Sequence, residues 1–212
     1  MPARYPERIV CLTEETTETL YLLGEERRIV GISGYTVRPP RARREKPRVS
    51  AFLSAKNDAI LALKPDLVLG FSDLQADIGR DLAKAGLNVL LFNQRSIDEI
   101  LSMVLLLSSM VDATERGQRL VRELESNLSE VRGAANRLPR RPRVYFEEWD
   151  EPMISGIRWV SELVEIAGGV DVFSDLSRSQ AAKTSFPSGP DRKRLAEGSL
   201  EMPKRSYSAS RR

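Results

Sequence analysis

The sequence predicts an α/β fold of two lobes with parallel-type sheets, joined by one long bridging helix, with an incomplete second lobe. Short apolar runs alternate with segments of helical period, and no hairpin signal separates them. An unusually long helical pattern follows over 112–138. The alternation of strand and helix then restarts and continues for only a few elements. Strands separated by helices favour a parallel sheet covered on both faces.

The first lobe is expected over 1–111. The apolar run Arg8–Leu12 suits a buried strand, and the helix expected over Thr16–Leu23 can end at Gly24 in the left-handed conformation. A strand over 28–32 precedes an irregular, proline-containing basic segment over 37–48. The remaining expected elements are a helix capped by Asn57 and running to Leu63, a strand over 66–70, a helix over 76–85, a strand over 88–92, and a helix from the Ser96 and Glu99 capping box to about Met110.

The bridging helix is expected over 112–138, where leucines recur every three or four residues among charges. About 25 helical residues make a rod of roughly 37 Å, more than is needed to cover one strand. A partial second lobe is expected over 139–183, with a strand over 142–147, a helix over 159–167 and a strand over 170–173. We expect 184–212 to be a basic, disordered tail, because it lacks any apolar period.

Composition excludes several kinds of site. The 212 residues include 33 Lys and Arg, 30 Asp and Glu, one cysteine and no histidine. Without histidine there is no Ser-His or Cys-His nucleophile and no imidazole metal site. Cys11 lies in an apolar run, which indicates a small buried hydrophobe. The excess positive charge follows Lys183, so the body is not basic and we expect no nucleic-acid partner.

The first residues, Met-Pro-Ala-Arg-Tyr-Pro-Glu-Arg, show neither the apolar region nor the cleavage site of an export signal. A cytoplasmic location therefore stays open. The longest apolar stretch, Met103–Val111, is too short to span a bilayer.

Several segments, in order over about 1–183, together resemble the substrate-binding proteins of ABC importers for cobalamin and ferric siderophores, the class III periplasmic binding proteins. Cobalamin-binding members are the most similar. The resemblance rests on the opening strand and helix, on Ile29–Tyr35 with Pro39-Pro40, on Asn57–Val68, and on Ser155-Gly156 with Ala167–Phe173. It implies two α/β lobes bridged by a stiff helix, with the ligand held between them largely by aromatic faces. It also implies a monomer that is not an enzyme, needs no catalytic cofactor or protein-bound metal, and is periplasmic.

The resemblance implies particular ligand-binding residues. Tyr35, Phe52 and Phe71 fall where the family places first-lobe aromatics, each after an expected strand. Trp149 follows the first strand of the second lobe among carboxylates, which indicates an exposed site and not core. Trp159 begins a helix and could equally be core. For a corrin ring, these side chains would supply apolar stacking surfaces.

The resemblance further implies docking to an inner-membrane ABC permease with its ATPase. The family's first-lobe docking carboxylate falls at Asp58, which can equally be an acid favoured by the helix dipole. Beyond Lys183 the family pattern stops, and we expect a chain shortened relative to its family, for example by a frameshift. Such a chain would bind its ligand less well.

Three alternatives stay open. A haem or ferric-siderophore ligand would favour arginines, and Arg38, Arg41, Arg43 and Arg44 keep that reading open. A cytoplasmic corrinoid sensor fits the missing export signal. An enzyme on a doubly wound fold is disfavoured, because the strand-to-helix turns lack G-x-G-x-x-G and G-K-[ST], and adjacent Glu147 and Glu148 would point to opposite faces of a strand.

Overall fold

The computed structural model describes residues 4–150 and 153–175. Its main feature is a five-stranded parallel sheet of order β3-β2-β1-β4-β5. The strands are β1 (Ile9–Cys11), β2 (Ile29–Ser33), β3 (Arg48–Ser50), β4 (Leu67–Phe71) and β5 (Val89–Phe92). The tail expected over 184–212 lies outside the described residues.

Helices cover both faces of this sheet, which confirms the predicted α/β class. Because strand side chains alternate, Ile9 and Cys11 pack into one core and Val10 and Leu12 into the other. All four are fully buried, as expected of a central parallel strand. The first-lobe helices are α1 (Glu14–Leu22), α2 (Ala42–Glu45), α3 (Asn57–Ala62), α4 (Ala76–Lys84) and α5 (Ile97–Met110), with short 3₁₀ helices η1 (Glu26–Arg28) and η2 (Asp73–Gln75).

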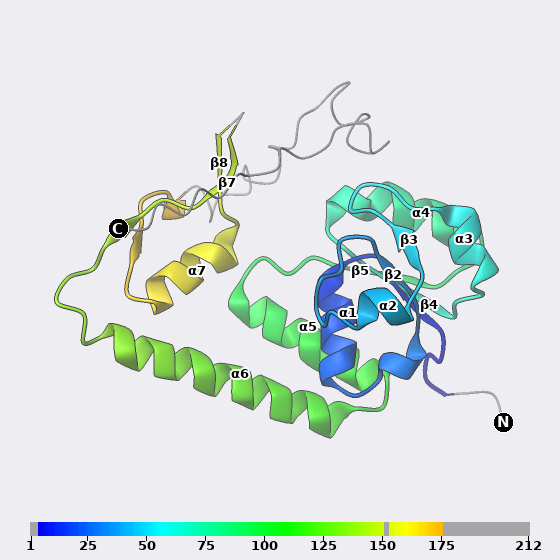
Figure 1. The fold of residues 1–212 in the computed structure, drawn as a ribbon, viewed down its shortest axis with the longest axis horizontal. Coiled ribbons are helices and arrows are strands. Elements are labelled where there is room, and N and C mark those ends of the chain that lie inside the picture. Colours follow the sequence, from blue (N-terminus) through cyan, green and yellow to red (C-terminus); the bar gives the residue numbers. More distant parts are fainter. Residues whose placement is uncertain (1–3, 151–152, 176–212) are drawn as a thin grey trace.

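A second group of elements follows the long helix α6 (Thr114–Ala135). Its 22 residues give a rod of about 33 Å that runs beneath both groups of elements (Figure 1). The second group comprises the parallel pair β6 (Arg143–Val144) and β9 (Val170–Asp171), the antiparallel pair β7 (Glu147–Asp150) and β8 (Met153–Ser155), and helix α7 (Arg158–Ile166). The lobe boundaries at 111, 138 and 183 stay predictions.

The structure differs from the sequence prediction at a few elements. The β7–β8 hairpin was not expected, because Glu151-Pro152 between its strands is not one of the Gly- or Asn-containing pairs that signal a tight turn. The predicted strand over 142–147 is therefore split between β6 and β7. Strand β3 and helix α2 lie within or beside the segment expected to be irregular, and both are very short. Asn57 is the first residue of α3 and not its cap.

Other local predictions are confirmed. Ser96 and Glu99 form the predicted capping box at the start of α5. Gly24 has a φ of +71°, the left-handed conformation that ends the α1 segment.

A buried ion-pair network ties the first lobe to α6. Glu25 bonds Arg28 at 2.6 Å and also pairs with Arg116 of α6. Arg28 reaches the carbonyl of Pro6 and the carboxylate of Glu7 as well. Burial alone would raise the pKa of Glu25, but the hydrogen bonds from the two arginines outweigh it and hold the pKa below its usual value. Glu25 therefore stays ionised and fixes the start of α6.

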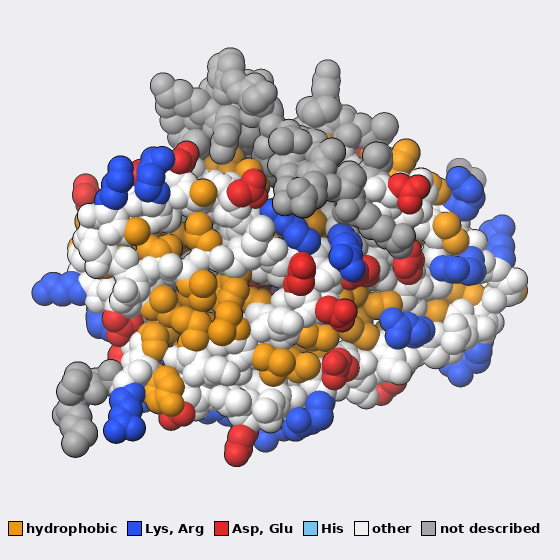
Figure 2. Space-filling view, turned by 180° about the vertical axis from the view of Figure 1, so that it is seen from behind, with side chains coloured by type: hydrophobic (Ala, Val, Ile, Leu, Met, Phe, Trp, Pro, Cys, Tyr) orange, Lys and Arg blue, Asp and Glu red, His pale blue; other side chains and the backbone are white. Residues whose placement is uncertain are grey.

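The surface carries some apolar side chains, among them Leu22 and Leu106. Hydrophobic side chains gather on the face seen from behind, between charged rims (Figure 2). Among the described residues no helix is long and apolar enough to cross a membrane. The same residues contain no group of three or more His, Cys, Asp or Glu side chains that could hold a metal ion.

Cys11 should be chemically inert in the folded protein. It is fully buried in β1, and burial raises the pKa of its thiol to about 12. We expect Ellman's reagent to leave the native thiol unmodified at mildly alkaline pH and to react fully once the chain is unfolded. Stoichiometric reaction of the native protein, at the rate of free cysteine, would contradict this burial.

Candidate functional site

The carboxyl ends of all five first-lobe strands lie at one edge of the sheet, because the strands are parallel, and candidate residues from four of the strands lie there. Tyr35 follows β2, Phe52 follows β3, Phe71 ends β4 and Arg95 follows β5. We call this edge the strand-end face. Loops at such an edge are where open α/β sheets present ligand contacts.

Gln75 joins the loops that carry the two phenylalanines. Its Oε1 accepts a hydrogen bond from the Phe71 backbone N–H at 3.0 Å, and its Nε2 donates to the Phe52 carbonyl at 2.9 Å. Gln75 is fully buried, so both bonds are shielded from water. Gly70 leaves room for this arrangement, since a Cβ there would lie 2.7 Å from Gln75 Oε1. The backbones of Phe52 and Phe71 are thus fixed relative to each other, and we call these two residues the aromatic pair.

The backbone next to Phe71 is strained. Ser72 has a φ of +62°, which is unfavourable for a residue with a side chain. Hydrogen bonds hold it there, because its N–H donates to the Phe92 carbonyl at 2.6 Å and its Oγ accepts from the Leu74 N–H at 3.2 Å. Strain held by surrounding bonds is common at functional sites.

Arg95 places a positive charge beside the aromatic pair. The carbon of its guanidinium lies 5.5 Å from the centre of the Phe71 ring. Its Nη2 donates to Asp73 at 3.1 Å and to Asn93 at 2.9 Å. Its Nε is buried and has no hydrogen-bond partner in the described part of the chain. Arg95 therefore keeps its positive charge against the Phe71 ring.

The first and second lobes touch where β5 leads into α5. The Arg95 carbonyl accepts a hydrogen bond from the backbone N–H of Trp159, at the start of α7. The Glu162 carboxylate accepts from the Ile97 N–H at 2.7 Å, and Arg158 holds that carboxylate at 2.7 Å. A hollow of about 480 Å³ adjoins this contact, lined by residues of α5, α6 and α7.

The candidate residues from the sequence lie in different settings. Tyr35 is about half exposed, at 53%, and its N–H donates to Ser33 Oγ. Phe52 and Phe71 are partly buried and are brought together through Gln75. Trp159 is partly buried at the contact between the lobes. Trp149 lies on β7 opposite Ile154, and its side chain is outside the described residues. Asp58 is exposed in the first turn of α3.

Sequence reasoning missed Gln75 and Arg95. A glutamine at the start of a helix is usually a surface residue, and only the fold shows that it spans two loops. Arg95 precedes the Ser96 capping box, and its position after an apolar strand was an available signal. Two of the arginines that the sequence singled out form ion pairs within the protein, Arg38 with Glu18 and Arg41 with Glu26.

Glu15 is a partly buried carboxyl group in the first turn of α1, the helix that follows β1. Burial raises its pKa, and the Thr13 hydroxyl, which donates to it at 2.6 Å, and the Gln94 side chain oppose the rise only in part. Gln94 Oε1 is itself buried without a partner among the described residues. Polar groups thus surround the same edge as the aromatic pair.

Comparison with known proteins identifies similar chains. The family model described as periplasmic binding protein matches residues 9–187. The vitamin B12-binding protein of Vibrio cholerae serotype O1 is 30% identical over 175 residues, which cover 80% of this chain and 62% of that protein. The chain therefore spans less than two thirds of the length of this curated relative.

Solved structures share the fold. The periplasmic vitamin B12 binding protein of Vibrio cholerae has a TM-score of 0.68 and 24% identity, covering 90% of this chain and 73% of that chain. A periplasmic heme-binding protein from Roseiflexus sp. in apo form has a TM-score of 0.70 and 23% identity, with the same coverage of both chains.

Replacing Gln75 should loosen both phenylalanine loops. The change Gln75→Ala leaves the Phe71 N–H and the Phe52 carbonyl without their buried partner and opens a small cavity. We expect the free energy of unfolding to fall by about 2–4 kcal/mol, measured by urea denaturation. The exposed Gln118→Ala in α6 is the matched control and should change it by less than about 0.5 kcal/mol. Equal effects of the two substitutions would contradict the bridging role.

Glu15 gives a pH-dependent prediction. The pKa of Glu15 is higher in the folded state than in the unfolded state. The unfolded chain therefore loses this proton at a lower pH than the folded chain, and the free energy of unfolding falls as the pH rises from the unfolded pKa through the folded pKa. We therefore expect Glu15→Gln, which still can accept from Thr13, to raise the melting temperature at neutral pH. The difference from the parent should vanish at pH below about 4, where both states carry a neutral carboxyl. A difference that is constant with pH would refute this assignment.

Proposed function

The chain belongs to the periplasmic binding protein family, and from this premise we propose that it captures a cobalamin-like corrinoid between its two lobes for delivery to an ABC importer. The relative from Vibrio cholerae supports the choice of corrinoid, since its printed name is vitamin B12-binding protein. The relatives cited above are named as binding proteins, which supports a role other than catalysis.

The observation that carries the proposal is the aromatic pair. The backbones of Phe52 and Phe71 are held by one buried side chain at the strand-end face, so little backbone freedom is lost when a ligand arrives. Flat apolar rings suit the face of a corrin macrocycle. Backbone groups of the loops at the same edge suit its amide side chains. Tyr35 extends this surface after β2.

The second lobe would complete the site. Trp159 lies at the contact between the lobes, because its backbone N–H bonds the Arg95 carbonyl. Trp149 lies on the β7–β8 hairpin, which projects from the second lobe on the side of the strand-end face (Figure 1). We assign both residues to the ligand's second face, as the sequence predicts.

Delivery requires a docking surface, and we assign Asp58 to it. Asp58 is exposed in the first turn of α3 and forms no ion pair with a described residue. A free surface carboxylate can pair with an arginine of a membrane permease that works with its ATPase. This role implies a periplasmic location and a monomeric protein.

Haem is the second candidate ligand. Arg95 beside Phe71 offers a cation that would attract a propionate carboxylate, and a heme-binding protein shares the fold. An anionic siderophore would need arginines that are free to bind it. Arg38 and Arg41 are less suited to this role, because each pairs with a glutamate of the protein itself.

Ligand binding by the aromatic pair can be measured directly. We expect purified protein to bind cyanocobalamin in equilibrium dialysis, and Phe52→Ala with Phe71→Ala to weaken binding about tenfold or more through lost stacking. Tyr5→Ala is the control, because Tyr5 precedes the opposite, amino-terminal end of β1, and it should leave the Kd unchanged. Haemin is titrated in parallel. Preferential binding of haemin would replace the corrinoid assignment, and binding of neither would overturn the proposal.

A further inference from the structure

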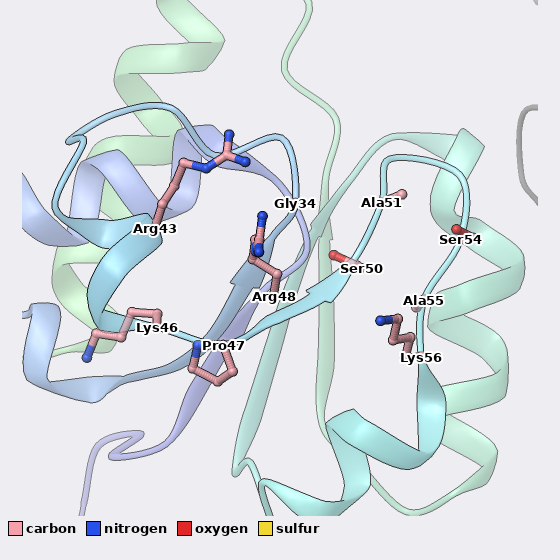
Figure 3. Close-up of a pocket in the computed structure, with 10 residues that line it drawn as sticks. All are labelled: Gly34, Arg43, Lys46, Pro47, Arg48, Ser50, Ala51, Ser54, Ala55 and Lys56. Atoms are coloured by element: carbon pink, nitrogen blue, oxygen red, sulfur yellow. The ribbon is translucent and has the colours of Figure 1, made fainter. Parts of the chain in front are cut away.

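A second hollow lies beside β3, on the outer edge of the first-lobe sheet. Its volume is about 600 Å³. Its lining comes from α2, from β3 and from the loop that leads into α3 (Figure 3). Ten residues line it: Gly34, Arg43, Lys46, Pro47, Arg48, Ser50, Ala51, Ser54, Ala55 and Lys56. Four of them are basic and none is acidic.

Three of the basic side chains border this space, two on one side of it and one on the other. Arg43 extends from α2 and Arg48 from the start of β3, and their guanidinium groups lie on the same side of the strand, toward Gly34 (Figure 3). Lys56 lies across the hollow from them, in the loop before α3, with its ammonium end turned toward β3, whereas Lys46 points away (Figure 3). We call the space enclosed by Arg43, Arg48 and Lys56 the basic hollow.

The protein does not neutralise these three charges. Neighbouring arginines on the same segment have acidic partners, since Arg38 pairs with Glu18 and Arg41 with Glu26. Within the described residues, Arg43, Arg48 and Lys56 have no such ion pair. The carboxylate of Glu45, also on α2, accepts a hydrogen bond from the Tyr21 hydroxyl at 2.7 Å and forms no ion pair with these three residues. Like charges around one concave space raise its positive potential.

The chemistry of the basic hollow fits oxyanions. A guanidinium presents a planar fork of N–H donors that matches phosphate and carboxylate oxygens, and an ammonium adds a compact charge. Ser54 adds a hydroxyl at the rim. Three cations would balance more than one negative charge, and the volume exceeds what a single phosphate needs.

We propose that the basic hollow is a binding site for a multivalent oxyanion, a group that carries at least two phosphate or carboxylate units. It is a different surface from the aromatic pair, because none of the aromatic candidates lines it, although its lining residues Gly34 and Ala51 adjoin Tyr35 and Phe52 in the chain. The proposal is independent of the corrinoid assignment.

Calorimetric titration with sodium pyrophosphate, and separately with citrate, tests the site at constant ionic strength. We expect saturable binding by the parent, weakened about tenfold or more by Arg48→Glu. Arg44→Glu is the matched control, because Arg44 is exposed on α2 next to Arg43, carries the same charge as Arg48 and does not line the hollow. It should change the Kd by no more than about twofold. Lys56→Glu is a second test variant, and circular dichroism verifies the fold of each.

Two results would overturn the proposal. One is no measurable heat with either anion at millimolar concentration. The other is equal weakening by Arg48→Glu, Lys56→Glu and Arg44→Glu, which would mean nonspecific attraction by net charge. Cosedimentation with phosphatidylglycerol vesicles identifies the source of the anion. If the protein cosediments with the vesicles and pyrophosphate releases it, the anion is a lipid phosphate. If the protein binds pyrophosphate but does not cosediment, the anion is a free one. Both outcomes support the site.

Discussion

The parallel direction of the first-lobe strands is the constraint on which the other features depend. Because all five strands run the same way, every segment that follows a strand begins at one edge of the sheet. This edge collects Phe52, Phe71 and Arg95 from three strands. It also sets the start of α5, where the first lobe meets the second. The candidate ligand surface and the contact between the lobes are therefore consequences of the same topology.

Polar contacts at both ends of α5 position the second lobe. At its amino-terminal end, the Glu162 carboxylate of α7 accepts from the Ile97 N–H, where a negative charge is favoured by the helix dipole. Beyond its carboxyl-terminal end, the network of Glu25 with Arg28 and Arg116 fixes the start of α6. A buried network of this kind is most valuable for setting geometry, because desolvation of the charges offsets much of their attraction. The helix between the two contacts acts as a spacer of fixed length.

Periodicity in the sequence was sufficient for the α/β class, for most first-lobe elements and for the long helix, because each has a repeating apolar face. It failed at β3, at α2 and at the β7–β8 hairpin, since a strand of three residues or a helix of four has too few residues to show a period. For the site, the resemblance could name Phe52 and Phe71, but not Gln75. Gln75 bonds the Phe52 carbonyl, 23 residues away in the chain, and the Phe71 N–H, four residues away. These two backbone groups come close to each other only when the chain folds.

The distribution of positive charge separates the two proposed sites by the kind of ligand that each favours. At the strand-end face, Arg95 already donates to Asp73 and Asn93, so much of its hydrogen-bonding capacity is used within the protein. The aromatic pair beside it therefore favours a flat ligand bound mainly by stacking, such as a corrin with neutral amides. In the basic hollow, Arg43, Arg48 and Lys56 retain their charge without an acidic partner among the described residues. Strong anion recognition thus belongs to the edge of β3, which is a reason to prefer a corrinoid over a highly anionic chelate at the aromatic pair.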